Sequence, residues 1–401
     1  MESLLIVLIF VVVSFALAEA LFKVRRLPFC LSGFIHSGIG FVIIGVLSGP
    51  LFLNILDSDR LDLMVSPTSI ALSWAGLVFG LQFRIQTMKL IAKSNYVMSF
   101  AQGLLTFLIV FLVLLPMRWI MPGIFISFKE TLPFIIALSA IASISSPLIV
   151  SSTIRRLNAH GTAARILKYI TSSDACVGVI IYGMAMSFFR TESISGNFFN
   201  GIVWCLATLG LGLLLGFLFH IFISRRLPRD DRLVVAVGMI VLTAGAASIL
   251  NISPFFLSVF TGFVVTNFAD NQDRLFRLLC AAEKPLFGFM LILLGAHFLM
   301  FENIVIIFGL YFVAARIIGK IIGMRYAIRC SSIKDSYPNA FGLALIGQGG
   351  IAVALSLDFI MRYPGWSGEF VASIVLVSFV ISGLFGPYLI KSLMKKEGGY
   401  N

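Results

Sequence analysis

Charged residues are scarce in this chain of 401 residues, at 12% against the roughly 25% that is typical of soluble domains. Hydrophobic residues make up 59%, a composition that indicates a membrane protein. The net charge of +12 does not indicate nucleic acid binding, because the basic residues lie in short clusters between apolar runs and form no long basic tail. We therefore expect an integral membrane protein that contacts the lipid bilayer and no nucleic acid.

Cysteine and histidine are also few, and neither forms a ligand pattern. The five cysteines and four histidines are widely spaced, with no CxxC or Cys/His spacing, so the sequence supports neither a disulfide framework nor a zinc site. No nucleophile–base pair is visible, and we interpret Glu19, Asp270 and Glu283 as helix-end charges rather than catalysts. The expectation is a protein that is not an enzyme and uses no cofactor.

Long apolar runs fill most of the chain. A helix that spans a bilayer needs about 20 predominantly apolar residues, and this template predicts an all-α polytopic membrane protein with thirteen transmembrane helices. They lie near residues 3–22, 33–53, 69–83, 95–115, 131–153, 166–188, 199–222, 233–250, 254–268, 285–301, 304–324, 338–358 and 369–392. No loop or tail is long enough to fold separately, so residues 1–401 are expected to form one membrane domain without a soluble regulatory domain.

The basic residues predict the orientation of these helices. Alternate loops contain basic clusters, from residues 23–26 in the first to residues 391–396 in the last. The intervening loops contain only Arg60, Arg118, Lys129, Arg190 and Arg362. Because basic loops stay in the cytoplasm, the N-terminus is expected outside and the C-terminus inside, in a bacterial inner (plasma) membrane.

One carboxylate lies far from the ends of its segment. Asp174, in segment 166–188, is interpreted as the only acidic residue deep in any predicted membrane segment. A charge at that depth costs about 2.5–3.5 kcal/mol on insertion scales, and such residues usually mark functional sites. We interpret Asp174 as a group that binds and releases an alkali cation or a proton. The alternative is a structural hydrogen-bond or ion-pair partner.

Two segments contain residues that interrupt helices. Segment 131–153 contains Ser145, Ser146 and Pro147, and a proline donates no intrahelical hydrogen bond. Segment 338–358 contains a second candidate break, made by Gly347, Gln348, Gly349 and Gly350. Interrupted segments at matching places in two halves indicate an inverted repeat, so we expect two crossing discontinuous helices. Either cluster alone is more often a close-packing site.

Two basic residues lie within segment 304–324. Arg316 and Lys320 are four residues apart, hence on one face of a helix, at a depth similar to that of Asp174. Opposite charges at similar depth favour pairing, and the sequence leaves both residues open as the basic partner.

These motifs occur in an order that resembles the monovalent cation:proton antiporter superfamily, the sodium/proton exchanger fold. The resemblance runs over nearly the whole chain. It rests on GFVIIGVLSGP (40–50), LVFGLQF (77–83), ASISSPLIVSSTIRRL (142–157), ITSSDACVGVI (170–180), RIIGKIIG (316–323) and GLALIGQGGIAV (342–353). No single motif is specific, but their order and spacing together are.

The resemblance implies a homodimer in which an ion-translocating core moves against a dimer scaffold. The scaffold is expected near residues 1–94 and 233–301, the core near 95–188 and 304–394, and a linker helix near 199–222. The implied activity is exchange of a monovalent cation, Na⁺ or alternatively K⁺ or Li⁺, for H⁺ by alternating access.

The ion site implied by the resemblance centres on Asp174. Ser173, Ser145 and Ser146 are expected to supply neutral oxygens, and Thr171 and Gln348 are weaker candidates. The chain departs from the family pattern at three places: Gln82 replaces an acid, Ser173 replaces the first acid of a pair, and Ser145-Ser146 stands where some members have Thr-Asp. A single titrating aspartate would therefore remain.

Two other functions stay open. A protein of this fold that lacks the usual acids fits a sensor or assembly partner without ion exchange. An ion-coupled organic-anion symporter of related fold would need a substrate-sized cavity with specific polar contacts, which the sequence does not reveal.

Overall fold

A computed structural model of the chain describes residues 9–16, 38–89, 93–120, 128–189, 198–223, 229–268, 272–299, 303–330 and 341–396, and within these ranges it contains helices and no strands. Residues 9–16 are helical. The labelled helices are α3 (Ile39–Ser48), α4 (Ser58–Leu63), α5 (Val65–Leu81), α6 (Ile85–Lys89), α7 (Lys93–Leu114), α8 (Met117–Ile120), α9 (Phe128–Ser143), α10 (Pro147–Arg156), α11 (Thr162–Phe188), α12 (Phe198–Ile223), α13 (Arg229–Leu250), α14 (Pro254–Phe268), α15 (Gln272–Cys280), α16 (Glu283–Ala296), α17 (Asn303–Cys330), α18 (Phe341–Ala344), α19 (Gly350–Arg362) and α20 (Trp366–Lys396).

The all-helical class predicted from the sequence is confirmed in the described residues, and each of the thirteen predicted segments overlaps a helix there. Eight helical stretches of that part of the chain are long and apolar enough to cross a membrane. Three shorter apolar helices, α3, α5 and α14, accompany them. The number of spanning helices and the orientation of the termini remain predictions.

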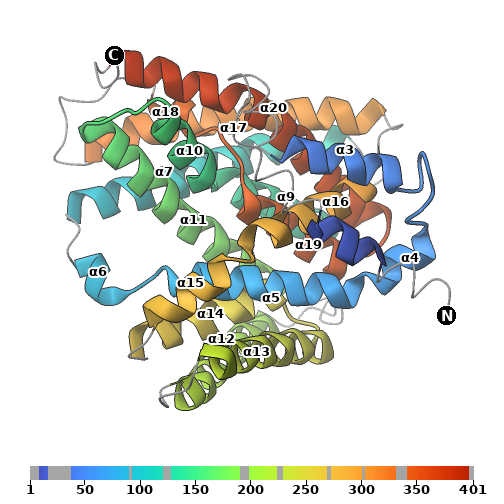
Figure 1. Cartoon of the computed structure of the whole chain (residues 1–401). Coiled ribbons are helices and arrows are strands. Elements are labelled where there is room, and N and C mark those ends of the chain that lie inside the picture. The colour runs from blue at the N-terminus through green and yellow to red at the C-terminus, as the bar shows by residue number, and fades with distance from the viewer. Residues whose placement is uncertain are drawn as a thin grey trace.

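The helices pack in two neighbouring groups. In one group α17 and α11 both pack against α7, and α9 packs against α11. In the other group α14 packs against α5, and α16 packs against α3. α12 and α13 lie beyond α5 and α14 at one edge of the molecule (Figure 1). α19 contacts members of both groups, so it joins them.

Glycine allows the close approach of α5 and α14. A Cβ atom placed on Gly80 would meet the backbone carbonyl of Val259 and the backbone nitrogen of Phe263, leaving no room for a side chain. Small residues at such crossings let two backbones pack directly in membrane proteins. The α5–α14 pair is therefore a tightly fixed unit.

Two of the packed helices are interrupted, at the places that the sequence predicts. α9 ends at Ser143, and α10 begins at Pro147, which occupies the first turn and lacks the N–H that would be unpaired there. α18 ends at Ala344, and α19 begins at Gly350. The breaks touch, because the Ser146 N–H donates to the Gly347 carbonyl at 2.8 Å. Whether the two halves form an inverted repeat remains a prediction.

A substitution at Gly80 tests the α5–α14 contact. Gly80→Ala should lower the free energy of unfolding by about 1–3 kcal/mol, because the added methyl group forces two backbones apart. Thermal unfolding in detergent measures the effect. Gly210→Ala in α12 is the matched control, since a Cβ atom there meets nothing within 4 Å. Equal stability of the two variants would contradict the packing described for Gly80.

Candidate functional site

The charged centre of the molecule is an ion pair with no solvent exposure. Asp174 of α11 and Lys320 of α17 have fully buried side chains, and the Lys320 Nζ lies 3.0 Å from the Asp174 Oδ2. Two charges removed from water are stabilised only when geometry is good and their remaining polar atoms are satisfied. The surroundings of the pair therefore decide whether it is stable.

The break after α9 supplies those remaining partners. The Lys320 ammonium has three donors, and besides Asp174 it donates to the Ser143 carbonyl at 2.6 Å and to the Ser145 Oγ at 2.7 Å. The Ser145 N–H lies 3.4 Å from the Asp174 Oδ1. The Ser145 Oγ lies 2.5 Å from the Asp174 Oδ2 and 2.9 Å from the Leu345 carbonyl, so its one proton has two alternative acceptors.

Arg316 has a different role from Lys320. Its guanidinium donates to the carbonyls of Ala142 at 3.1 Å and Ile144 at 2.9 Å, and also to those of Ile346 and Gly347. These carbonyls lie at and just beyond the C-terminal ends of α9 and α18, where backbone acceptors lack intrahelical partners and the helix dipole is negative. Of the two candidate partners of the carboxylate, the geometry selects Lys320, while Arg316 joins the two breaks.

The other predicted residues differ in how close they come to the carboxylate. The Ser146 Oγ caps the N-terminus of α10. Ser173 is buried next to Asp174, but within the described residues no hydrogen bond joins it to the carboxylate. Thr171 donates back to carbonyls of its own helix. Gln348 donates its backbone N–H to the Ser382 Oγ at 3.2 Å, and its fully buried side-chain amide has no hydrogen-bond partner in the described part of the chain.

A cavity of about 230 Å³ borders this site at the two breaks. Ser145 and Ser146 line it at the breaks, and Gln82 at the end of α5 and Glu283 at the start of α16 also line it. Since Ser145 both lines the cavity and contacts Asp174, one side chain separates the carboxylate from the cavity. The wall of the cavity therefore contacts the buried acid through Ser145.

A second buried acid was missed by the sequence analysis. Asp358 of α19 stands at the last position of the predicted segment 338–358 but is fully buried, so Asp174 is not the only buried acid in the described residues. Its Oδ2 accepts from the Tyr182 hydroxyl at 2.8 Å, its Oδ1 accepts from the Ser253 Oγ at 2.7 Å, and Arg362 lies 3.7 Å from the Oδ2. The apolar template ended its segment at residue 358, whereas the helix continues to Arg362. The spacing of four residues between Asp358 and Arg362 indicates an ion pair on one face of a helix and was the signal in the sequence that could have identified this acid.

The sequence and the fold both resemble those of known proteins. A family model described as "Sodium/hydrogen exchanger, transmembrane" matches residues 9–396. The structure of the sodium proton antiporter MjNhaP1 from Methanocaldococcus jannaschii at pH 8 is similar, with a TM-score of 0.68 and 17% identity over 98% of this chain and 99% of that chain. An electron microscopy structure of the same antiporter gives a TM-score of 0.64 and 15% identity, with the same coverage. No curated protein matches the chain. At these identities the structural likeness shows the fold.

Replacement of Arg316 tests its contacts with the breaks. Arg316→Lys should lower the free energy of unfolding by about 2–4 kcal/mol, since an ammonium cannot span carbonyls from both interrupted helices and leaves some of them unpaired. Thermal unfolding in detergent measures it. Arg325→Lys, an exposed position on the same helix, should change nothing. An unchanged Arg316→Lys variant would show that the carbonyl contacts are dispensable.

Proposed function

Because the chain belongs to the sodium/hydrogen exchanger family, we propose that it is a secondary active transporter that exchanges a monovalent cation for H⁺. Na⁺ is the primary candidate, and K⁺ and Li⁺ are alternatives. The observation that carries the proposal is the buried Asp174, which lies at the meeting point of two broken helices and one side chain away from a cavity. Membrane transporters commonly bind ions at such breaks.

Exchange follows from competition for one carboxylate. In the structure the Lys320 ammonium forms an ion pair with the Asp174 Oδ2. A cation that binds there must take over that interaction, and a proton on the carboxylate would equally prevent cation binding. Hard cations prefer oxygen ligands, and the Ser145 hydroxyl, which contacts the carboxylate, and the Leu345 carbonyl, which contacts that hydroxyl, are candidates to supply them. Ser173 and the remaining carbonyls of the breaks are further candidates.

Transport also requires that the site open alternately to each side of the membrane. The 230 Å³ cavity between α5, α16 and the breaks is proposed as the access route from one side. Movement of the core, residues 95–188 and 304–394, against the scaffold, residues 1–94 and 233–301, would open the other. This partition and the homodimer form part of the proposal.

Family membership favours exchange over the two alternatives. A sensor or assembly partner does not require a cavity leading to a buried acid. An organic-anion symporter is disfavoured by the cavity itself, since its lining includes the acid Glu283 and many apolar side chains. The replacement of two acids by Gln82 and Ser173 is the observation that favours a sensor, and the buried Asp174 beside the cavity weighs against it.

The central test is Asp174→Asn. This variant should abolish cation-driven dissipation of a pH gradient in everted vesicles, because an amide neither titrates nor carries the negative charge that balances a bound cation. Liposome flux with Na⁺, K⁺ and Li⁺ over a pH series identifies the ion. Asp59→Asn, at an exposed position on α4, is the matched control and should exchange normally. Wild-type exchange by Asp174→Asn would refute the assignment.

Ser145→Ala tests the neutral ligand. The variant should raise the KM for the cation roughly tenfold, the equivalent of one lost hydroxyl contact of about 1.4 kcal/mol to a charged group. The KM is measured by the same vesicle assay. Ser152→Ala on α10, whose hydroxyl donates to the Ile149 carbonyl away from the acid, should leave the KM unchanged. A normal KM in Ser145→Ala would remove this hydroxyl from the site.

A further inference from the structure

The second buried acid lies where the two groups of helices meet. Asp358 belongs to α19, within the proposed core, and Ser253 directly precedes α14, within the proposed scaffold, so the 2.7 Å hydrogen bond between them crosses that boundary. Arg362 also crosses it, by donating to the Asn251 carbonyl at 3.4 Å. Tyr182, which donates to the other oxygen of Asp358, belongs to the core.

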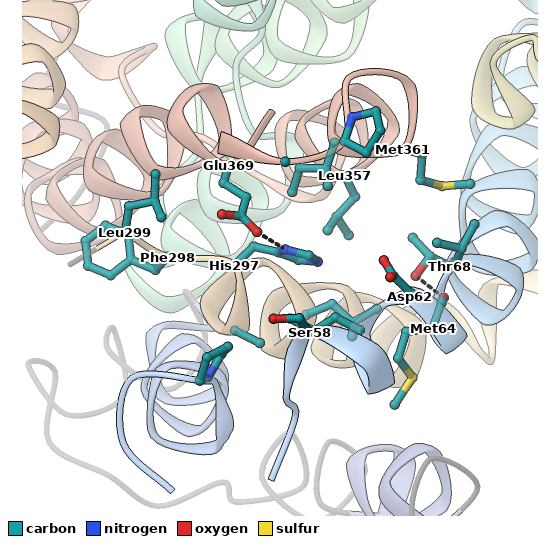
Figure 2. A pocket seen from close by; sticks show the side chains of 18 of the residues that line it. Ser58, Asp62, Met64, Thr68, His297, Phe298, Leu299, Leu357, Met361 and Glu369 are labelled. Atoms are coloured by element: carbon teal, nitrogen blue, oxygen red, sulfur yellow. Dashed lines mark hydrogen bonds and ion pairs between the residues drawn. The ribbon is translucent and has the colours of Figure 1, made fainter. Parts of the chain in front are cut away.

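Two more polar contacts cross the same boundary nearby. The Nδ1 of His297, just after α16, lies 3.1 Å from the Glu369 Oε1 on α20, and Figure 2 shows this pair beside a pocket that Met361 of α19 also lines. The backbone N–H of Leu299 donates to the Ser373 Oγ at 3.0 Å. His297 and Glu369 retain 16% and 27% of their side-chain exposure, so this pair is more accessible to water than Asp358.

These contacts lie at the opposite end of the helices from the access cavity. α16 runs from Glu283, which lines the cavity, to Ala296, beside His297; fourteen residues of helix span about 21 Å. α19 likewise runs from Gly350 at the cavity to Asp358 and Arg362. Each of these two helices thus has one end at the cavity beside the ion site and the other end at the hydrogen bonds between core and scaffold.

We propose that Asp358 is a positioning residue that latches core to scaffold at the end opposite the cavity. The inference rests on the proposed exchange function, in which the core moves. When the latch opens, Asp358 loses its contacts with the Ser253 hydroxyl and the Phe255 backbone N–H, and Arg362 loses its contact with the Asn251 carbonyl. Tyr182 and Arg362 move with the core and keep the carboxylate partnered. Opening therefore avoids the cost of a buried carboxylate without a partner. The latch sets the balance between the two access states.

Ser253→Ala and Tyr182→Phe form a matched pair. Each removes one hydroxyl that donates to Asp358, but only the first hydroxyl crosses the boundary. Ser253 also accepts the Phe256 N–H and so caps α14. Ser253→Thr retains both the cap and the hydroxyl, and it serves as the rescue variant. All three are compared with the wild-type full chain.

The first measurement does not depend on transport. Spin labels on Leu63, exposed on α4, and Ser367, at the start of α20, report the distance between scaffold and core. The native cysteines are first replaced by serine. The labelled protein is then mixed with excess unlabelled protein, so that distances between labels on two protomers of a dimer contribute little. Ser253→Ala should increase a second, longer-distance population several-fold, while Tyr182→Phe and Ser253→Thr keep the wild-type distribution. An unchanged Ser253→Ala distribution, or an equal change in Tyr182→Phe, would overturn the latch.

The second measurement uses right-side-out and everted vesicles. A ligand's apparent affinity scales with the population of the state that binds it. Ser253→Ala should therefore lower the KM at the face bearing His297 and Glu369 relative to the KM at the Glu283 face, by up to roughly tenfold for one lost charged hydrogen bond. A change in maximal rate with an unchanged KM ratio would overturn the proposal. If wild-type vesicles show no exchange, the proposed function is refuted. The spin-label distances still test whether the contact between Asp358 and Ser253 holds core and scaffold together.

Discussion

A carboxylate held away from water inside a membrane must be neutralised by the protein itself, and the arrangement around Asp174 follows from that constraint. One ammonium, from Lys320, neutralises it, and the three donors of that ammonium are all used. Two of its three acceptors, the Ser143 carbonyl and the Ser145 hydroxyl, are available because α9 ends there. The interruption of the helix is therefore a requirement of the charge pair as much as a site for ions.

The same constraint applies to backbone groups. Ending two helices in a dry interior leaves carbonyls without partners, and each would cost free energy comparable to a lost hydrogen bond. Arg316 solves this problem with one planar guanidinium that reaches both interrupted helices. Two basic residues one helical turn apart thus separate two tasks: Arg316 stabilises the crossing, and Lys320 stays with the acid that is proposed to exchange ions.

The sequence predicted the residues whose types are rare in an apolar setting. Asp174, Lys320 and the two breaks stood out because charge, proline and clustered glycine are costly or disruptive in a membrane helix, and the structure brings them together. Thr171 was placed in the site by its nearness in sequence, but the helix turns its hydroxyl back to its own backbone. Asp358 was missed because hydropathy locates the end of an apolar run, while a capped and ion-paired helix continues past it.

Burial alone does not distinguish the two aspartates, since both are fully enclosed. Their neighbours do. The partners of Asp174 include Ser145, which lines a cavity, so a ligand can compete for that acid from one side. Asp358 is held between an arginine on its own helix and hydroxyls on two other helices, and neither of the two pockets described above includes it in its lining. Competition favours ion exchange at the first acid. A hydrogen bond across the proposed boundary between core and scaffold favours control of access at the second, so the same residue type can serve two steps of the proposed cycle.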